Sequence, residues 1–198
     1  MKRLIQISSL VAAVVLVSCN SDDVGKLDTQ FISNLPADPP TGFGPQGQPI
    51  GTTGKFTLFS FASGSVVANA DSLTDKWDIG FRGTTIIING GTDRIGTAGV
   101  QLVQGEFANL TTAPEAGYLE DAGNTLAVNS SWYTYNATAR TVIPNAGSVF
   151  MIRTAKGKYA KMEILSYYQD APSSPTSNDA SRYYTFQFVH QPSGSRKF

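Results

Sequence analysis

Cysteine and histidine are almost absent from this sequence, which excludes most nucleophilic and zinc chemistry. The 198 residues include one cysteine, Cys19, and one histidine, His190. Catalytic triads need a base beside the nucleophile, and zinc sites draw mainly on these two residue types. A glycosidase-type carboxylate pair stays open, because its members can be far apart in the chain, but no recognisable spacing favours one. We therefore expect a protein that is not an enzyme.

An excess of charge is also missing. The chain has 15 basic and 15 acidic side chains, so its formal net charge is zero, and no basic stripe runs along it. Proteins that bind nucleic acid usually carry a clustered positive charge that meets the phosphates. The sequence therefore predicts no nucleic-acid partner.

The apolar run near the N-terminus is short. It spans Leu10–Val17 behind Lys2 and Arg3, and it lacks the length to cross a bilayer. It ends in Leu-Val-Ser-Cys19, which resembles a bacterial lipobox. We predict that residues 1–18 are a lipoprotein signal peptide and that Cys19 is lipidated; the alternative is a plain secretory signal with an incidental cysteine.

The residues after Cys19 predict where the protein is displayed and how it is attached. Asn20-Ser21-Asp22-Asp23 resembles the acidic tag that sends some lipoproteins to the outer face of the outer membrane. We therefore expect the protein to be displayed on the outer membrane, facing the cell exterior. Residues 19–53 are polar and rich in Pro and Gly, with too few apolar side chains to offset the entropy of ordering. They are expected to form a flexible, semi-stiff tether.

Residues 54–198 are predicted to form a single antiparallel, all-β domain. Aromatic and β-branched residues are frequent, and charged residues make up only 15% of the chain. The clearest element is a hairpin over 148–168, in which an apolar run and an alternating strand flank a turn at Gly157. Alternation also places Trp77, Ile79 and Phe81 on one face, which we expect to be buried against this hairpin.

A series of motifs follows the lipobox and the tether. They are FTLFSFASGSVV, KWDIGFR, VFMIRTAKGKYAKMEILSYYQD and YYTFQFV, which together span Phe56 to Val189. In the order and spacing of these motifs the chain resembles the HmuY-like family of haem-binding bacterial outer-membrane lipoproteins. The resemblance implies the family's β-rich fold, haem as ligand, and a TonB-dependent outer-membrane receptor as partner.

The family's metal ligands have no counterpart here. In the haem-binding members a pair of His or Met side chains holds the iron, in a region that corresponds to residues 122–147. That region is shorter in this chain and contains neither residue type. No ligand can be transferred residue by residue.

The remaining candidates for a haem site are aromatic. Trp132, Tyr133 and Tyr135 lie in the segment that holds the family's ligands; tyrosine can ligate ferric haem and aromatic rings can stack on a porphyrin. The alternative is an aromatic patch that simply covers the sheet. His190 is a weaker candidate, since it lies at a strand end, and Met151 and Met162 are interpreted as core residues.

Two functions therefore remain open. The first is a membrane-anchored haem binder that captures haem for uptake, and the second is a structural or partner-binding surface lipoprotein that keeps the fold without haem. A spectroscopic titration with hemin distinguishes them.

Overall fold

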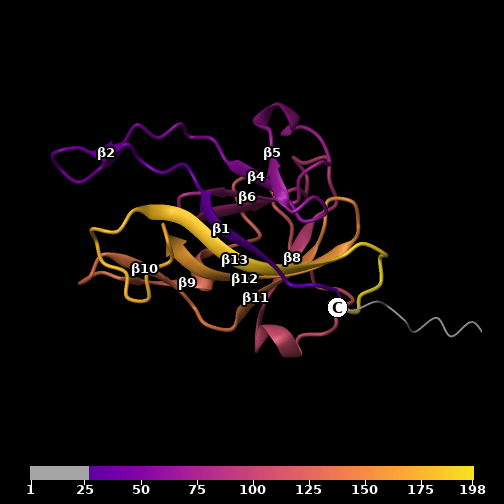
Figure 1. Cartoon of the computed structure of the whole chain (residues 1–198). Coiled ribbons are helices and arrows are strands. Elements are labelled where there is room, and N and C mark those ends of the chain that lie inside the picture. The colour runs from indigo at the N-terminus through magenta and orange to yellow at the C-terminus, as the bar shows by residue number, and fades with distance from the viewer. Residues whose placement is uncertain (1–26) are drawn as a thin grey trace, which may run out of the picture.

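The computed structural model describes residues 27–198, which form two antiparallel sheets packed face to face (Figure 1). The larger sheet has the order β1 (Gln30–Pro36), β13 (Ser181–Gln191), β12 (Tyr159–Tyr168), β11 (Ser148–Arg153) and β8 (Gly99–Gln104). The smaller has the order β5 (Ser65–Val67), β4 (Thr57–Ser60), β6 (Ile79–Arg82) and β7 (Thr85–Ile88). The predicted all-β class is confirmed.

Short elements project from these sheets or cover them. Two hairpins stand apart, β2 (Gly42–Phe43) with β3 (Pro49–Ile50) and β9 (Tyr133–Asn136) with β10 (Thr141–Pro144). The helical elements of the described chain are the 3₁₀ turns η1 (Asn69–Asp71), η2 (Phe107–Asn109) and η3 (Ser130–Trp132). None of them is long and apolar enough to cross a membrane.

The predicted hairpin is β11–β12, at the centre of the larger sheet. Phe150 lies opposite Met162 in its register, and the turn contains Gly157 in the left-handed region at φ 69°. Both Phe150 and Met162 are buried in the main core between the sheets. The prediction is confirmed because a local apolar pattern and a local turn specify this unit.

Aromatic rings from the two sheets form that core. Phe59 of β4 meets Phe186 and Phe188 of β13 edge to face, with ring centroids 5.3 and 5.7 Å apart. The ring centroids of Phe81 in β6 and Tyr184 in β13 lie 4.8 Å apart. Such pairs add about 0.5–1.5 kcal/mol each beyond the area that they bury. These contacts fix the two sheets against each other.

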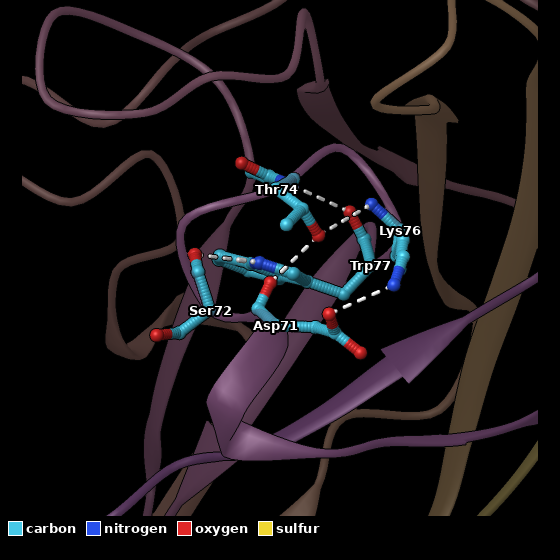
Figure 2. Close-up of polar contacts among 6 residues, drawn as sticks. Asp71, Ser72, Thr74, Lys76 and Trp77 are labelled. Atoms are coloured by element: carbon cyan, nitrogen blue, oxygen red, sulfur yellow. Dashed lines mark hydrogen bonds and ion pairs between the residues drawn. The ribbon is translucent and has the colours of Figure 1, made fainter.

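The prediction for Trp77 is right about burial and wrong about the face. Trp77 is 0% exposed, but it packs with Leu58 and Ile87 on the outer side of the smaller sheet, whereas Ile79 and Phe81 face the main core. The reason is that β6 begins only at Ile79, so strand alternation does not extend back to Trp77. Its indole Nε1 donates to the carbonyl of Ser72 at 3.0 Å, as Figure 2 shows.

Asp78, rather than Trp77, connects this region to the β11–β12 hairpin. Its buried carboxylate accepts hydrogen bonds from the backbone N–H of Ala155 in the hairpin turn and of Phe61 after β4, each at 2.8 Å. A single side chain thereby satisfies two buried backbone donors from different sheets.

The prediction of a tether over residues 19–53 is wrong for residues 30–36. These residues form β1, which pairs with β13 and places Leu35 in the core at 5% exposure. The pairing depends on the free edge of β13, which lies about 150 residues later in the chain and leaves no local signal. The predicted signal peptide 1–18 and Cys19 lie outside the described residues.

Residues 37–53 make an excursion from β1 to β4 that carries the β2–β3 hairpin. Asp38 closes it: its carboxylate accepts hydrogen bonds from the N–H of Thr53 at 2.6 Å, from the Thr53 hydroxyl at 2.9 Å, and from the N–H of Gly54 at 2.8 Å. The start and the end of the excursion are therefore held together at the edge of the fold.

Candidate functional site

The β9–β10 hairpin holds the aromatic residues singled out in the sequence. In its register Tyr133 lies opposite Pro144, and Tyr135 lies opposite Val142. Asn145 closes the base of the hairpin, where its N–H donates to the carbonyl of Trp132 at 2.8 Å and its Oδ1 accepts from the Thr134 hydroxyl at 2.7 Å. Tyr133 and Tyr135 share one face because side chains two residues apart in a strand do so.

Trp132 belongs to the core. It is 1% exposed, and its ring lies 4.7 Å from that of Tyr133 and 5.6 Å from that of Tyr184, measured between centroids. Its indole Nε1–H is buried and has no hydrogen-bond partner within residues 27–198. Leaving such a donor unpaired costs about 1–3 kcal/mol.

Tyr133 and Tyr135 are the accessible tyrosines of this cluster. Tyr133 is half-buried against the core, while Tyr135 is 56% exposed. Within the described chain neither hydroxyl makes a hydrogen bond. By contrast, the Tyr184 hydroxyl donates to the carbonyl of Gly83 at 2.8 Å, and the Tyr168 hydroxyl accepts from the N–H of Val142 at 2.9 Å.

The deeper tyrosines are held in the protonated form. Burial raises the pKa of Tyr167 and Tyr168, and it raises the pKa of Tyr184 well above its usual value. A tyrosine must lose its proton to ligate a ferric iron as tyrosinate, and a raised pKa opposes that loss. Tyr133 and Tyr135 are therefore better placed as ligands than the buried tyrosines beside them.

A cavity of about 420 Å³ lies next to this hairpin. Three segments line it: Pro39, Pro40 and Phe43 of the 37–53 excursion, Arg140 and Val142 of the hairpin, and the end of β12 together with residues 176–183. In Figure 1 the β2–β3 and β9–β10 hairpins project from the same end of the molecule as these residues. The volume lies within the range of about 300–1,000 Å³ that is usual for ligand pockets.

The charges around this cavity favour an anionic ligand. Arg140 and Arg182 line it, and neither forms an ion pair with a carboxylate of the described residues. The lining carboxylate, Asp179, is engaged instead by the N–H and the hydroxyl of Thr176 at 2.7 and 2.9 Å. Guanidinium groups bind carboxylates in a bidentate manner, so the propionates of a porphyrin match these two side chains.

The arginines and aromatic side chains that line the cavity fit the carboxylates and the ring of a haem, whereas a tyrosine ligand would have to come from the neighbouring β9–β10 hairpin. The residues present do not fit the family's pair of His or Met ligands, because residues 122–147 contain neither. Tyr133 and Tyr135 do not themselves line the cavity, although Val142 in its wall lies opposite Tyr135. Among the described residues no group of three or more His, Cys, Asp or Glu could hold a metal ion.

His190 lies away from this cluster. It is half-buried opposite Ala160 at the far end of β13, and burial, with the charge of Lys158, lowers its pKa. Six residues separate it from Tyr184, which is about 20 Å along a strand. The structure therefore does not bring His190 together with the β9–β10 hairpin.

Sequence reasoning missed the other walls of the cavity. The two methionines are core residues as predicted, with Met162 at 0% and Met151 at 1% exposure. Arg140 and Arg182 escaped notice because nothing in the sequence brings the turn before β10 and the start of β13 together; both adopt left-handed backbone conformations, at φ 55° and 67°. The Tyr167-Tyr168 pair at the end of β12 was the one signal in the sequence for these walls of the cavity.

Comparison with solved structures identifies the fold as the β-rich fold of HmuY-like proteins. The crystal structure of the apo HmuY analogue TFO from Tannerella forsythia has a TM-score of 0.50 at 18% identity, covering 86% of this chain and 100% of that one. Apo PinO from Porphyromonas gingivitis has a TM-score of 0.51 at 13% identity, covering 84% of this chain and 98% of that one. No curated protein matches the chain.

A sequence match points to the same family. Residues 53–146 match the family described as HmuY protein. Over these residues the chain resembles HmuY-like proteins, and the resemblance inferred from the order of its motifs is confirmed.

Proposed function

We propose that this protein is a membrane-anchored surface lipoprotein that binds haem for uptake. The observation that carries the proposal is the cavity beside the β9–β10 hairpin, where aromatic walls and two arginines without carboxylate partners meet at the end of an HmuY-like fold. Cys19 supplies the lipid anchor in this proposal, and the acidic residues after it favour the outer face of the outer membrane.

Tyr135 and Tyr133 are the proposed iron ligands. Their phenolic oxygens are hard donors suited to ferric iron, and no competing hydrogen bond from the described residues holds either hydroxyl. Arg140 and Arg182 pair with the porphyrin carboxylates, and Phe43 and Val142 contribute apolar contacts. The haem is cargo rather than a catalyst in this proposal, and it passes on to a TonB-dependent outer-membrane receptor.

A hemin titration tests both the ligand and its donors. The chain should give a Soret band characteristic of a bound ferric haem, and the Tyr133→Phe, Tyr135→Phe double variant should lose that band while its far-UV circular dichroism is unchanged. Tyr159→Phe is the matched control, because Tyr159 lies at the opposite end of β12 from Tyr168. His190→Ala should leave the spectrum unaltered.

The absence of His and Met from residues 122–147 favours a second candidate, a partner-binding surface lipoprotein with the same fold and no haem. A wild-type chain that gives no Soret shift with hemin would support it and overturn the haem proposal. Haem binding that survives in the double variant would refute only the assignment of the tyrosines.

A further inference from the structure

A second cavity lies on the opposite face of the five-stranded sheet. It is a groove of about 840 Å³ over the outer face of β12 and β13. Lys161, Glu163, Gln187 and Val189 form its floor, whereas their neighbours Met162, Phe186 and Phe188 face the main core. The haem site proposed above lies beside the β9–β10 hairpin, whose Tyr133 packs on that main core together with the preceding Trp132 of η3. The groove is therefore a separate site.

The walls of the groove combine apolar and polar side chains. On one side stand Leu27 and Phe31, where the chain enters β1, and on the other stand Phe107 of η2 and Phe198. Figure 1 shows η2 on the side of this sheet that faces away from β4, β5 and β6. Phe31 is 63% exposed, so the groove leaves a large apolar ring uncovered. An exposed aromatic wall beside a formed cavity is typical of a binding surface.

A buried cation lies in this groove. Lys161 is 4% exposed, and its ammonium donates to the carbonyls of Phe107 at 2.8 Å and Leu110 at 3.0 Å. It also lies 4.5 Å from the centroid of the Phe107 ring. A lysine has three N–H donors, so one remains after these two bonds.

Nothing within residues 27–198 neutralises this charge. Lys161 forms no ion pair with a described carboxylate, and burial lowers its pKa. Glu163 is on the same face, but its carboxylate is engaged by the N–H of Gly147 at 3.2 Å and by Gln187 Nε2 at 2.8 Å. Buried charges are usually paired, so a lysine whose third donor is free favours an anion at this point.

We propose that this groove binds a long-chain fatty acid, with its carboxylate on Lys161 and its acyl chain along Leu27, Phe31 and Val189. One buried ammonium with one spare donor matches a single carboxylate, and the exposed Lys197 adds a second positive charge. Glu106, which also lines the groove, accepts a hydrogen bond from Asn109 Nδ2 at 2.6 Å. Glu163 repels an anionic head at its own end of the groove and so orients the ligand.

The position of the groove supplies the ligand's source. Leu27 is eight residues after Cys19, a span of at most about 29 Å of extended chain. If Cys19 carries the lipid anchor proposed above, the groove opens within that reach of the bilayer, where fatty acids partition.

Calorimetric titration of the full chain carrying Cys19→Ala tests the proposal without an acyl group on the protein itself. Dodecanoate, kept below its micellar concentration, should bind, with an affinity that rises roughly two- to fourfold per added methylene across an octanoate-to-dodecanoate series. Dodecyltrimethylammonium, with the same chain and the opposite charge, should bind at least about tenfold more weakly. Equal binding of the two amphiphiles would overturn the proposal.

Variants separate the head contact from the tail contact. Lys161→Met keeps the length and apolar character of the side chain and should weaken dodecanoate binding by about tenfold or more, while Lys55→Met, at an exposed lysine outside the groove, should change nothing. Phe31→Glu changes an exposed side chain and leaves Lys161 in place. It should weaken the binding of dodecanoate and strengthen the binding of dodecyltrimethylammonium. Unchanged dodecanoate binding in Phe31→Glu would refute the site even if Lys161→Met fails to fold.

Other occupants give different results. Binding of dodecanoate only after Asp22→Asn and Asp23→Asn would show that the chain's own acidic segment fills the groove, which overturns the proposal. Displacement of dodecanoate by hemin would mean that the groove is the haem site and would also overturn it. Failure of hemin to bind anywhere leaves the fatty-acid result unaffected, so the two proposals fail independently.

Discussion

The side chain of Trp77 stabilises the smaller sheet from its outer side, and its removal gives the sharpest test of the fold. The ring is 0% exposed and packs with Leu58 and Ile87. The site also depends on Gly80, because a Cβ there would lie 2.9 Å from Ile87 Cγ1 and 3.1 Å from Leu58 Cδ2. Trp77→Ala leaves a cavity in this cluster, and we expect it to lower the free energy of unfolding by about 3–5 kcal/mol.

The hydrogen bond can be separated from the packing. Trp77→Phe removes the bond from indole Nε1 to the Ser72 carbonyl and keeps most of the ring, so about 1–3 kcal/mol should be lost. Figure 2 shows that the bond holds the loop after η1 to the indole, together with the contact of Lys76 and Asp71. That exposed ion pair should matter little, so Lys76→Met should cost at most about 1 kcal/mol.

Urea unfolding followed by circular dichroism and by the fluorescence of Trp132 measures all three variants. Equal m-values are needed for the comparison, since a changed slope indicates a changed denatured or native state. A loss of less than about 1 kcal/mol for Trp77→Ala would refute the buried position of the indole.

Two further predictions concern the anchor and the closure of the excursion. Cys19→Ala should abolish membrane association, because acylation there is the proposed anchor; an unchanged membrane fraction would refute the lipoprotein assignment. Burial opposes ionisation of Asp38, but the donors of Thr53 and Gly54 outweigh it and lower its pKa. A lowered pKa stabilises the fold above about pH 3.9 and the effect is lost as pH falls through the folded-state value, so Asp38→Asn should cost about 1–3 kcal/mol at pH 7 and less at pH 3. A cost that is independent of pH would contradict this account.

The local parts of the fold could be predicted from the sequence. The β11–β12 hairpin carries its own apolar alternation and its own turn at Gly157, so neighbouring residues specify it. Strand β1 carries little such information, because its stability comes from hydrogen bonds to β13 and from the burial of Leu35. The prediction of the face on which Trp77 lies was wrong for a related reason. Alternation applies only inside a strand, and β6 begins two residues after Trp77.

The candidate site shows the same division. Tyr133 and Tyr135 were found because a single segment of sequence contains them. The cavity beside them depends on where three distant segments meet, which includes the excursion after β1 and the loop before β13. The distance of His190 from the hairpin follows from the length of β13, a property that strand alternation alone does not reveal.

The pairing of the first described strand with the last has a consequence for the order of assembly. A chain is synthesised from its N-terminus, so β1 emerges long before β13, its partner, exists. Until Ser181–Gln191 arrives, Phe31 and Leu35 have no strand to lie against and the edge of β12 is open. Closing so long a loop is slow, and an unpaired edge invites association with other chains. The nascent protein thus passes through a stage in which β1 is unpaired and can associate with other chains.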